Sequence, residues 1–89
     1  ENMSGLPMPD GSVMPIFGSG GGERTAQEFG VPLLAKLPID LTIREGGDAG
    51  TPVACGEGPT AELFHALAAR LVSILDARKG AQPALKVVN

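Results

Sequence analysis

Cysteine, aromatic residues and basic clusters are scarce in this sequence, and the scarcity of the first and third excludes several functions. Cys55 is the only cysteine among 89 residues, so one copy can form neither an intrachain disulfide nor a multi-cysteine metal site. A single cysteine also fits a reducing compartment. The net charge is −3 and no basic run stands out, which leaves nucleic-acid phosphates and anionic membranes without electrostatic attraction. No apolar run approaches the ~20 residues of a membrane-spanning helix. We expect a cytoplasmic protein that binds neither nucleic acid nor membrane.

Glycine and apolar residues are abundant instead. The chain has 13 glycines and is 43% hydrophobic, which is typical of a globular chain of one domain at most. Prolines and glycines interrupt residues 1–16, so this part is predicted to be loop, with residues 1–3 ending a strand that begins upstream. Because Glu1 opens the chain in place of an initiator methionine, we expect a fragment or a processed product.

Three segments in the middle of the chain have the patterns of regular elements. A short helix is predicted over Gly21–Phe29, followed by a glycine in the left-handed conformation. The nearly continuous apolar run Val31–Ile39 predicts a strand buried on both faces, as in a parallel sheet. Asp40 is a natural N-cap, so residues 40–50 are predicted to contain another short helix.

The longest predicted element is a helix over Pro59–Lys79, closed by Gly80. Its apolar residues repeat at spacings of three and four and form one stripe: Phe64, Leu67, Ala68, Leu71, Ile74 and Leu75. We expect residues 1–80 to belong to one domain and residues 81–89 to form a loose tail. One strand and one striped helix do not close a core, which predicts the last third of an α/β domain, incomplete alone. The alternative is a small helical unit with a short sheet.

The glycine-rich stretch "FGSGGGER" at 17–24 raises the question of a phosphate-binding loop. Such a loop needs a lysine and a Ser/Thr after the glycines, but Glu23 follows them here and would repel phosphate. We therefore favour a tight turn that lets a helix pack closely against its neighbours.

Ligands of open α/β sheets bind beyond the carboxyl ends of the strands. If residues 1–3 and 31–37 are adjacent strands, Asn2 and the corner Pro38–Asp40 lie at that edge. The Asn2 carboxamide offers a donor and an acceptor that match a purine edge, and Asp40 could accept from a ligand or simply cap its helix. The other polar candidates are interpreted as packed or solvated side chains: Arg44, Glu45, Asp48, Cys55 and His65.

Four blocks together carry a specific resemblance. They are, in order, "ENMSG" at 1–5, "PIFGSGGGER" at 15–24, "GVPLLAKLPID" at 30–40 and "IREGGDAGTPV" at 43–53. In this order and spacing the chain resembles the C-terminal part of the Mrp/ApbC-type P-loop ATPases. These are relatives of MinD and of the nitrogenase iron protein that act as iron–sulfur cluster carriers. The likeness is dense over residues 1–53 and looser through 59–79.

The resemblance implies an α/β fold in which this chain is the C-terminal portion of a mostly parallel P-loop NTPase sheet with flanking helices. It implies ATP with Mg²⁺, held by a lysine-bearing loop that this chain lacks, and Asn2, Pro38 and Asp40 at the border of the adenine. It also implies a homodimer and apo iron–sulfur client proteins. The family's cluster-binding Cys-x-x-Cys pair aligns with Met8 and Gly11, so that site is absent in its usual form.

Two functions follow from this reading. The first is the C-terminal segment of an ATP-binding iron–sulfur carrier ATPase, which contributes the adenine edge and is not catalytic alone. The alternative is a non-catalytic interaction module that docks through its C-terminal amphipathic helix. An upstream "KGGVGK"-like loop in the coding sequence would distinguish the first from the second.

Overall fold

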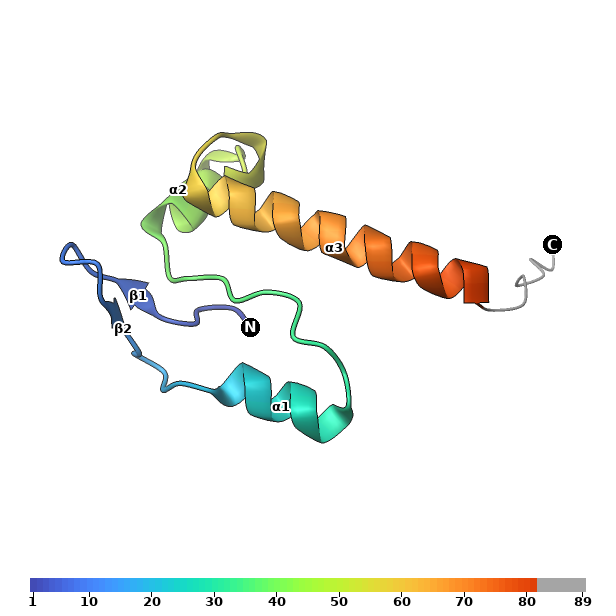
Figure 1. Ribbon diagram of the computed structural model, residues 1–89. Coiled ribbons are helices and arrows are strands. Elements are labelled where there is room, and N and C mark those ends of the chain that lie inside the picture. The colour runs from blue at the N-terminus through green and yellow to red at the C-terminus, as the bar shows by residue number, and fades with distance from the viewer. Residues whose placement is uncertain (82–89) are drawn as a thin grey trace.

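The computed structural model describes residues 1–81 of the chain. Two short strands come first, followed by two short helices, a 3-10 turn and one long helix (Figure 1). In chain order the elements are β1 (Leu6–Pro7), β2 (Val13–Met14), α1 (Gly21–Phe29), α2 (Leu41–Ala49), η1 (Val53–Cys55) and α3 (Pro59–Ala81). The tail expected over residues 81–89 lies outside the described residues, apart from Ala81 at the end of α3.

The two strands form an antiparallel hairpin within the segment that was predicted to be loop. Leu6 pairs with Met14 and Pro7 with Val13, so the ladder is only two residues long on each side. Gly5 precedes the hairpin and is buried, and a Cβ there would lie 2.5 Å from Val13 Cγ1. Glycine is therefore required for the close approach of the two arms.

The prediction of a regular strand over Val31–Ile39 is wrong. The segment is extended but has no strand assignment, and its side chains are half-buried or exposed, with Val31 52% exposed. Its two prolines have no N–H to donate to a sheet, which limits any ladder that it can form. Within residues 1–81 the only sheet is the hairpin β1–β2.

Residues 35–39 nevertheless run beside residues 1–5 in the same direction. The Glu1 nitrogen donates to Ala35 O at 2.8 Å, and Leu37 N donates to Glu1 O at 2.8 Å. Further along, Ser4 N donates to Leu37 O at 2.9 Å and Ile39 N to Gly5 O at 2.8 Å. The first pair of bonds has the pattern of a parallel ladder. A regular ladder would continue through Met3, so the bonds made by Ser4 N and Gly5 O are shifted by one and by two residues on the first segment.

The helix α1 has the predicted bounds. Gly20, with φ of 78°, precedes it, and Gly30, with φ of 64°, follows it in the left-handed conformation that was predicted for that position. Glu23 in its first turn forms an ion pair with Lys36, which connects α1 to the extended segment. This ion pair lies at the surface, where each side chain is 48% exposed.

The helices α2 and α3 are linked through η1. Asp40 caps α2 as predicted, and Gly46 lies so close to the following loop that a Cβ there would be 2.6 Å from Thr51 O. The helix α3 continues through Gly80 to Ala81, so the prediction that Gly80 closes it is wrong. A glycine is tolerated inside a helix at a cost of about 1 kcal/mol, and it terminates the helix only where the backbone turns left-handed.

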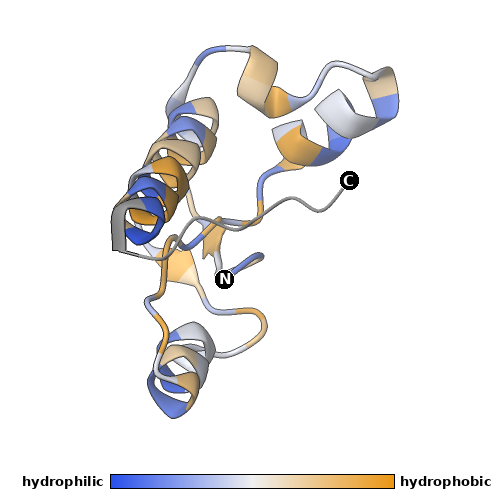
Figure 2. Cartoon of the chain, turned by 90° about the vertical axis from the view of Figure 1, so that its right-hand side faces the viewer, coloured by the Kyte–Doolittle hydropathy of each residue, from blue (hydrophilic) through white to orange (hydrophobic). Residues whose placement is uncertain are grey.

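Little apolar surface is buried in this arrangement. Ala61, 1% exposed, is the one buried hydrophobic side chain among the described residues. The large apolar residues remain accessible, and Figure 2 shows them along α3 and on the segment between α1 and α2. Of the predicted α3 stripe, Phe64, Leu67 and Ile74 are half-buried, and the other members are exposed. No described helix combines the length and the apolar character that crossing a bilayer requires.

Candidate functional site

A hollow of about 470 Å³ lies where the hairpin, the corner after the extended segment and the start of α3 meet. Its lining includes Leu6 and Pro7 from β1, Pro38, Ile39 and Asp40 from the corner, and Pro59, Thr60 and Leu63 from α3. The structure thus brings together two of the three residues that the sequence indicated, Pro38 and Asp40. The walls are mainly apolar, and the Asp40 carboxylate and the Thr60 hydroxyl are their polar side-chain groups.

Asp40 connects the first turns of two helices. Its Oδ1 accepts from Thr42 N at 2.9 Å, which caps α2, and its Oδ2 accepts from the Thr60 hydroxyl at the start of α3. The hydrogen bond from Thr60 and then that from Thr42 lower the pKa of Asp40 from its ordinary value of 3.8, so the carboxylate is ionised at neutral pH. Capping is therefore confirmed for this residue, and contact with a ligand stays a prediction.

Thr60 is a member of the site that the sequence analysis missed. It lies 20 positions from Asp40, and no local pattern connects a threonine in the first turn of one helix to the cap of another. Only a prediction of how the starts of α2 and α3 lie relative to each other could have identified it.

Asn2 does not line the hollow, and it lies in the segment whose residues Glu1 and Ser4 form backbone hydrogen bonds with Leu37. Its Oδ1 accepts from Met3 N at 2.9 Å, and Met3 has φ of 54°, in the left-handed region. The Asn2 side chain is exposed, and its amide nitrogen has no partner among the described residues. The donor half of the carboxamide is thus free to meet a ligand.

The glycine-rich stretch at the start of α1 contacts a carboxylate of the protein itself. Glu1 Oε1 accepts from Gly22 N at 3.0 Å, at the positive end of the helix dipole. A Cβ on Gly22 would lie 3.0 Å from both Glu1 Cβ and Glu1 Cδ, so glycine permits the close contact. This arrangement agrees with the tight-turn interpretation of the stretch.

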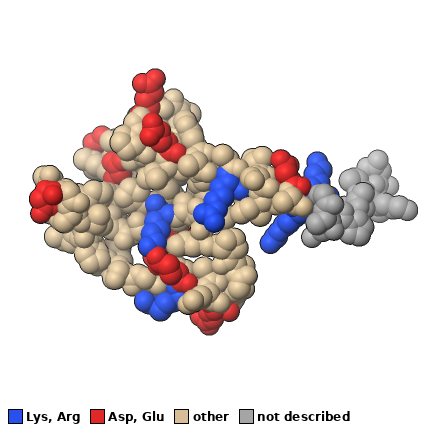
Figure 3. All heavy atoms as spheres, in the orientation of Figure 1, with Lys and Arg blue, Asp and Glu red and all other residues tan. Residues whose placement is uncertain are grey.

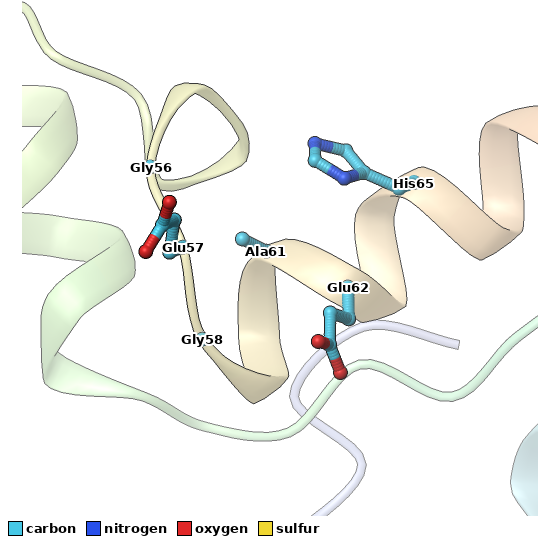
Figure 4. A pocket seen from close by; sticks show the side chains of 6 residues that line it. All are labelled: Gly56, Glu57, Gly58, Ala61, Glu62 and His65. Carbon is cyan, nitrogen blue, oxygen red and sulfur yellow. The ribbon is translucent and has the colours of Figure 1, made fainter.

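A second hollow, of about 380 Å³, lies between η1 and the start of α3 (Figure 4). His65 Nε2 is 2.7 Å from Ala54 O, so the ring packs α3 onto η1. Figure 4 shows the Glu62 carboxylate directed away from the His65 ring. This geometry gives His65 a structural contact, and no group of three metal-binding side chains forms within residues 1–81. On the face seen in Figure 3, acidic and basic side chains are interspersed.

The position implied for a cluster-binding cysteine pair is the turn between β1 and β2. There Gly11 N donates to Met8 O at 3.0 Å, and Asp10 Oδ1 accepts from both Ser12 N and Ser12 Oγ. Met8 supplies a thioether, Gly11 supplies no side chain, and Cys55 is exposed on η1. The residues of one copy therefore do not fit a cluster bound by thiolates.

Comparison with known proteins extends over most of the chain. The sequence model of a family described as "ParA: NUBPL iron-transfer P-loop NTPase" matches residues 1–72. Curated relatives include the "Iron-sulfur cluster carrier protein" of Pyrococcus abyssi (46% identical) and that of Pyrococcus horikoshii (49% identical), each over 82 residues and 90% of this chain. The protein of the same description from Methanocaldococcus jannaschii is 39% identical over 80 residues, or 89% of this chain.

The chain spans 28% of the length of each of these three relatives. The family match nevertheless covers well over half of the chain, and the relatives share more than a third of the aligned residues. The α/β character expected from the sequence fits a P-loop NTPase. The chain belongs to the NUBPL-type iron-transfer P-loop NTPases, a family that agrees with the Mrp/ApbC-type resemblance of its four sequence blocks.

Proposed function

We propose that this chain is the C-terminal part of an ATP-binding P-loop NTPase and forms the adenine-facing edge of its nucleotide site. The observation that carries this proposal is the hollow of about 470 Å³, which unites Pro38 and Asp40 with the start of α3. Asn2 is in the segment that leads into Leu6 of this lining, and its amide donor has no partner among the described residues. Within the proposal, residues 1–80 belong to one P-loop domain whose main sheet is parallel.

The chemistry of these residues suits a purine base. Leu6, Pro38 and Leu63 offer apolar surface to the faces of a ring. The Asn2 carboxamide can donate to a ring nitrogen and accept from an exocyclic amino group. At the N7 edge adenine presents this pattern, with N7 and the N6 amino group, whereas guanine presents two acceptors, N7 and O6. The ionised Asp40 would repel phosphate, which places the phosphates on the far side of the base.

The rest of the activity belongs to parts that this chain does not contain. In the proposal, a lysine-bearing loop within the remaining length of the protein holds the phosphates and Mg²⁺. In the proposal, the whole protein hydrolyses ATP as a cytoplasmic homodimer. It also carries iron–sulfur clusters to apo client proteins, and the name of its relatives, "Iron-sulfur cluster carrier protein", supports the carrier part of this role. The 89 residues alone should not hydrolyse ATP.

The test uses the native gene product that carries this chain. Its reading frame should contain a glycine-rich loop with the lysine, and a fluorescent ATP analogue should bind to the purified protein. Asn2→Ala should weaken ATP binding about 5- to 30-fold, the loss expected for one or two hydrogen bonds. Gln27→Ala removes another exposed carboxamide, from α1, and is the matched control. A frame without the loop, or unchanged affinity in Asn2→Ala, contradicts the proposal.

One observation favours the alternative of an interaction module. On α3, Leu71, Val72 and Leu75 are 43%, 57% and 52% exposed, although part of this face lines a smaller hollow with Val31 and Leu34. In this reading the exposed side of α3 docks on a partner. A reading frame that opens near Glu1 and a purified chain that captures a second copy through α3 would favour this function over the first.

A further inference from the structure

We propose that Glu1 is a positioning residue, which holds Asn2 in place for the purine base. The inference rests on the proposed function, because it takes Asn2 as the group that meets adenine. Glu1 is the point at which three separate parts of the chain meet: the segment 1–5, the extended segment 35–37 and the start of α1.

The backbone of Glu1 fixes the register of segment 1–5 against the extended segment 35–39. Its nitrogen donates to Ala35 O and its carbonyl accepts from Leu37 N, both at 2.8 Å. Two bonds to residues on either side of Lys36 define a single register, since a shift of one residue would break both. Asn2 then follows at a set distance from Pro38.

The side chain of Glu1 fixes its orientation. Glu1 Oε1 accepts from Gly22 N at 3.0 Å, and the first-turn amides and the helix dipole favour a negative group there. The helix α1 is itself held to the same extended segment by the ion pair between Glu23 and Lys36. The Glu1 carboxylate is therefore bound to α1, and α1 is in turn attached to the extended segment through Lys36.

The segment after Glu1 needs such an anchor because its backbone is strained. Met3 is the one non-glycine residue within 1–81 that has positive φ, a conformation in which the Cβ atom crowds the backbone. Leu37 bonds to the residues on both sides of Asn2 and Met3: its N–H donates to Glu1 O, and its O accepts from Ser4 N. Asn2 and Met3 therefore form a bulge opposite Leu37. If the Glu1 end is released, the bulge can relax to an ordinary extended strand, and the Asn2 carboxamide then changes its position relative to Pro38.

The expected consequence is a loss of base selectivity. The native gene product should prefer ATP to GTP because the Asn2 carboxamide matches the adenine edge. Glu1→Ala should reduce the ATP-to-GTP affinity ratio about fivefold, the effect of one hydrogen bond. Glu1→Gln keeps an oxygen acceptor for Gly22 N and should retain most of the ratio. Gly22→Ala should act like Glu1→Ala, because its Cβ would lie 3.0 Å from the Glu1 side chain.

The experiment measures ATP and GTP dissociation constants of the native gene product with these variants, together with melting temperature. Glu28→Ala removes an exposed acid from α1, the helix that contains Gly22, and is the matched control. It should change neither the ATP-to-GTP affinity ratio nor the melting temperature. A general loss of stability weakens the binding of ATP and GTP alike, whereas misplacement of Asn2 changes the ratio of their dissociation constants. Exchange of the Leu37 amide, read by NMR, reports the anchor even in a variant that binds no nucleotide, and it should accelerate in Glu1→Ala.

The two ways of failing are distinct. If Asn2→Ala lowers the ATP-to-GTP ratio and Glu1→Ala does not, Glu1 has no positioning role and the proposed function stands. If Asn2→Ala leaves the ratio unchanged, the proposed function fails, and the role of Glu1 fails with it. Unchanged Leu37 exchange in Glu1→Ala also overturns the inference.

Discussion

The carboxylate of Asp40 holds the first turns of two helices, so its removal has a cost that can be worked out. Oδ1 caps α2 through Thr42 N, and replacing an N-cap by alanine costs about 1 kcal/mol. Oδ2 accepts from the Thr60 hydroxyl, a bond that contributes about another 1 kcal/mol at most. Asp40→Ala should therefore favour opening of the first turn of α2 by about 1 to 2 kcal/mol, which is a factor of ~5 to 30.

Hydrogen exchange of the Thr42 amide measures this cost directly, because that amide is the donor to Oδ1. In the 89-residue chain, Asp40→Ala should accelerate its exchange by the same factor, after correction for the intrinsic rate. Asp40→Asn retains one acceptor oxygen and should lie much closer to the wild type. Asp48→Ala removes an exposed acid near the other end of α2 and serves as the control. Equal Thr42 exchange in the wild type and Asp40→Ala would refute the cap.

The two hydrogen bonds of the Asp40 carboxylate also predict that the protection of the Thr42 amide depends on pH. The pKa of Asp40 is lower in the fold than its ordinary value of 3.8, because Thr60 and Thr42 donate to the ionised form. Its contribution is therefore complete above the unfolded pKa and is lost as the pH falls through the folded pKa. Protection of Thr42 should be constant near neutrality and decline below about pH 4, whereas in Asp40→Asn this decline should be absent.

Two further predictions concern packing and metal content. Gly46→Ala should lower the free energy of unfolding by about 1 to 3 kcal/mol, because its Cβ would lie 2.6 Å from Thr51 O in the loop after α2. At Gly47 a Cβ meets nothing within 4 Å, so Gly47→Ala should be neutral or slightly stabilising in the same denaturant unfolding measurement. Anaerobic incubation of the 89-residue chain with iron and sulfide should give no visible cluster absorbance, since one copy offers only Cys55 as a thiolate. A stable absorbance band that persists in Cys55→Ser would show that other side chains of this chain can hold a cluster.

Local signals in the sequence predicted the short helices accurately. The bounds of α1 follow from the glycines on either side of it, and Asp40 was identified as the cap of α2 because aspartate at that position satisfies a free amide. These features depend on residues within one or two turns of each other. That is why the sequence alone could specify them.

Features that depend on distant residues were not predictable in the same way. The apolar composition of 31–39 indicated a buried strand, but strand formation depends on which segments lie alongside it. The hairpin was missed because its two-residue strands are too short to show any alternation. Thr60 lines the hollow, and its bond to Asp40 spans 20 positions; the contact of Glu1 with Gly22 spans 21.

The glycine-rich stretch illustrates how one local motif can serve different chemistry. Free amides at a helix N-terminus attract an anion of any origin, and here the anion is the Glu1 carboxylate rather than a phosphate. The motif then connects segments of the protein instead of holding a ligand. If Glu1 positions Asn2, the stretch still contributes to nucleotide recognition. It then acts on the adenine base rather than on the phosphates, and it acts through Glu1. Its glycines would be required for the same reason as in a phosphate loop, which is that an acceptor must approach the backbone closely.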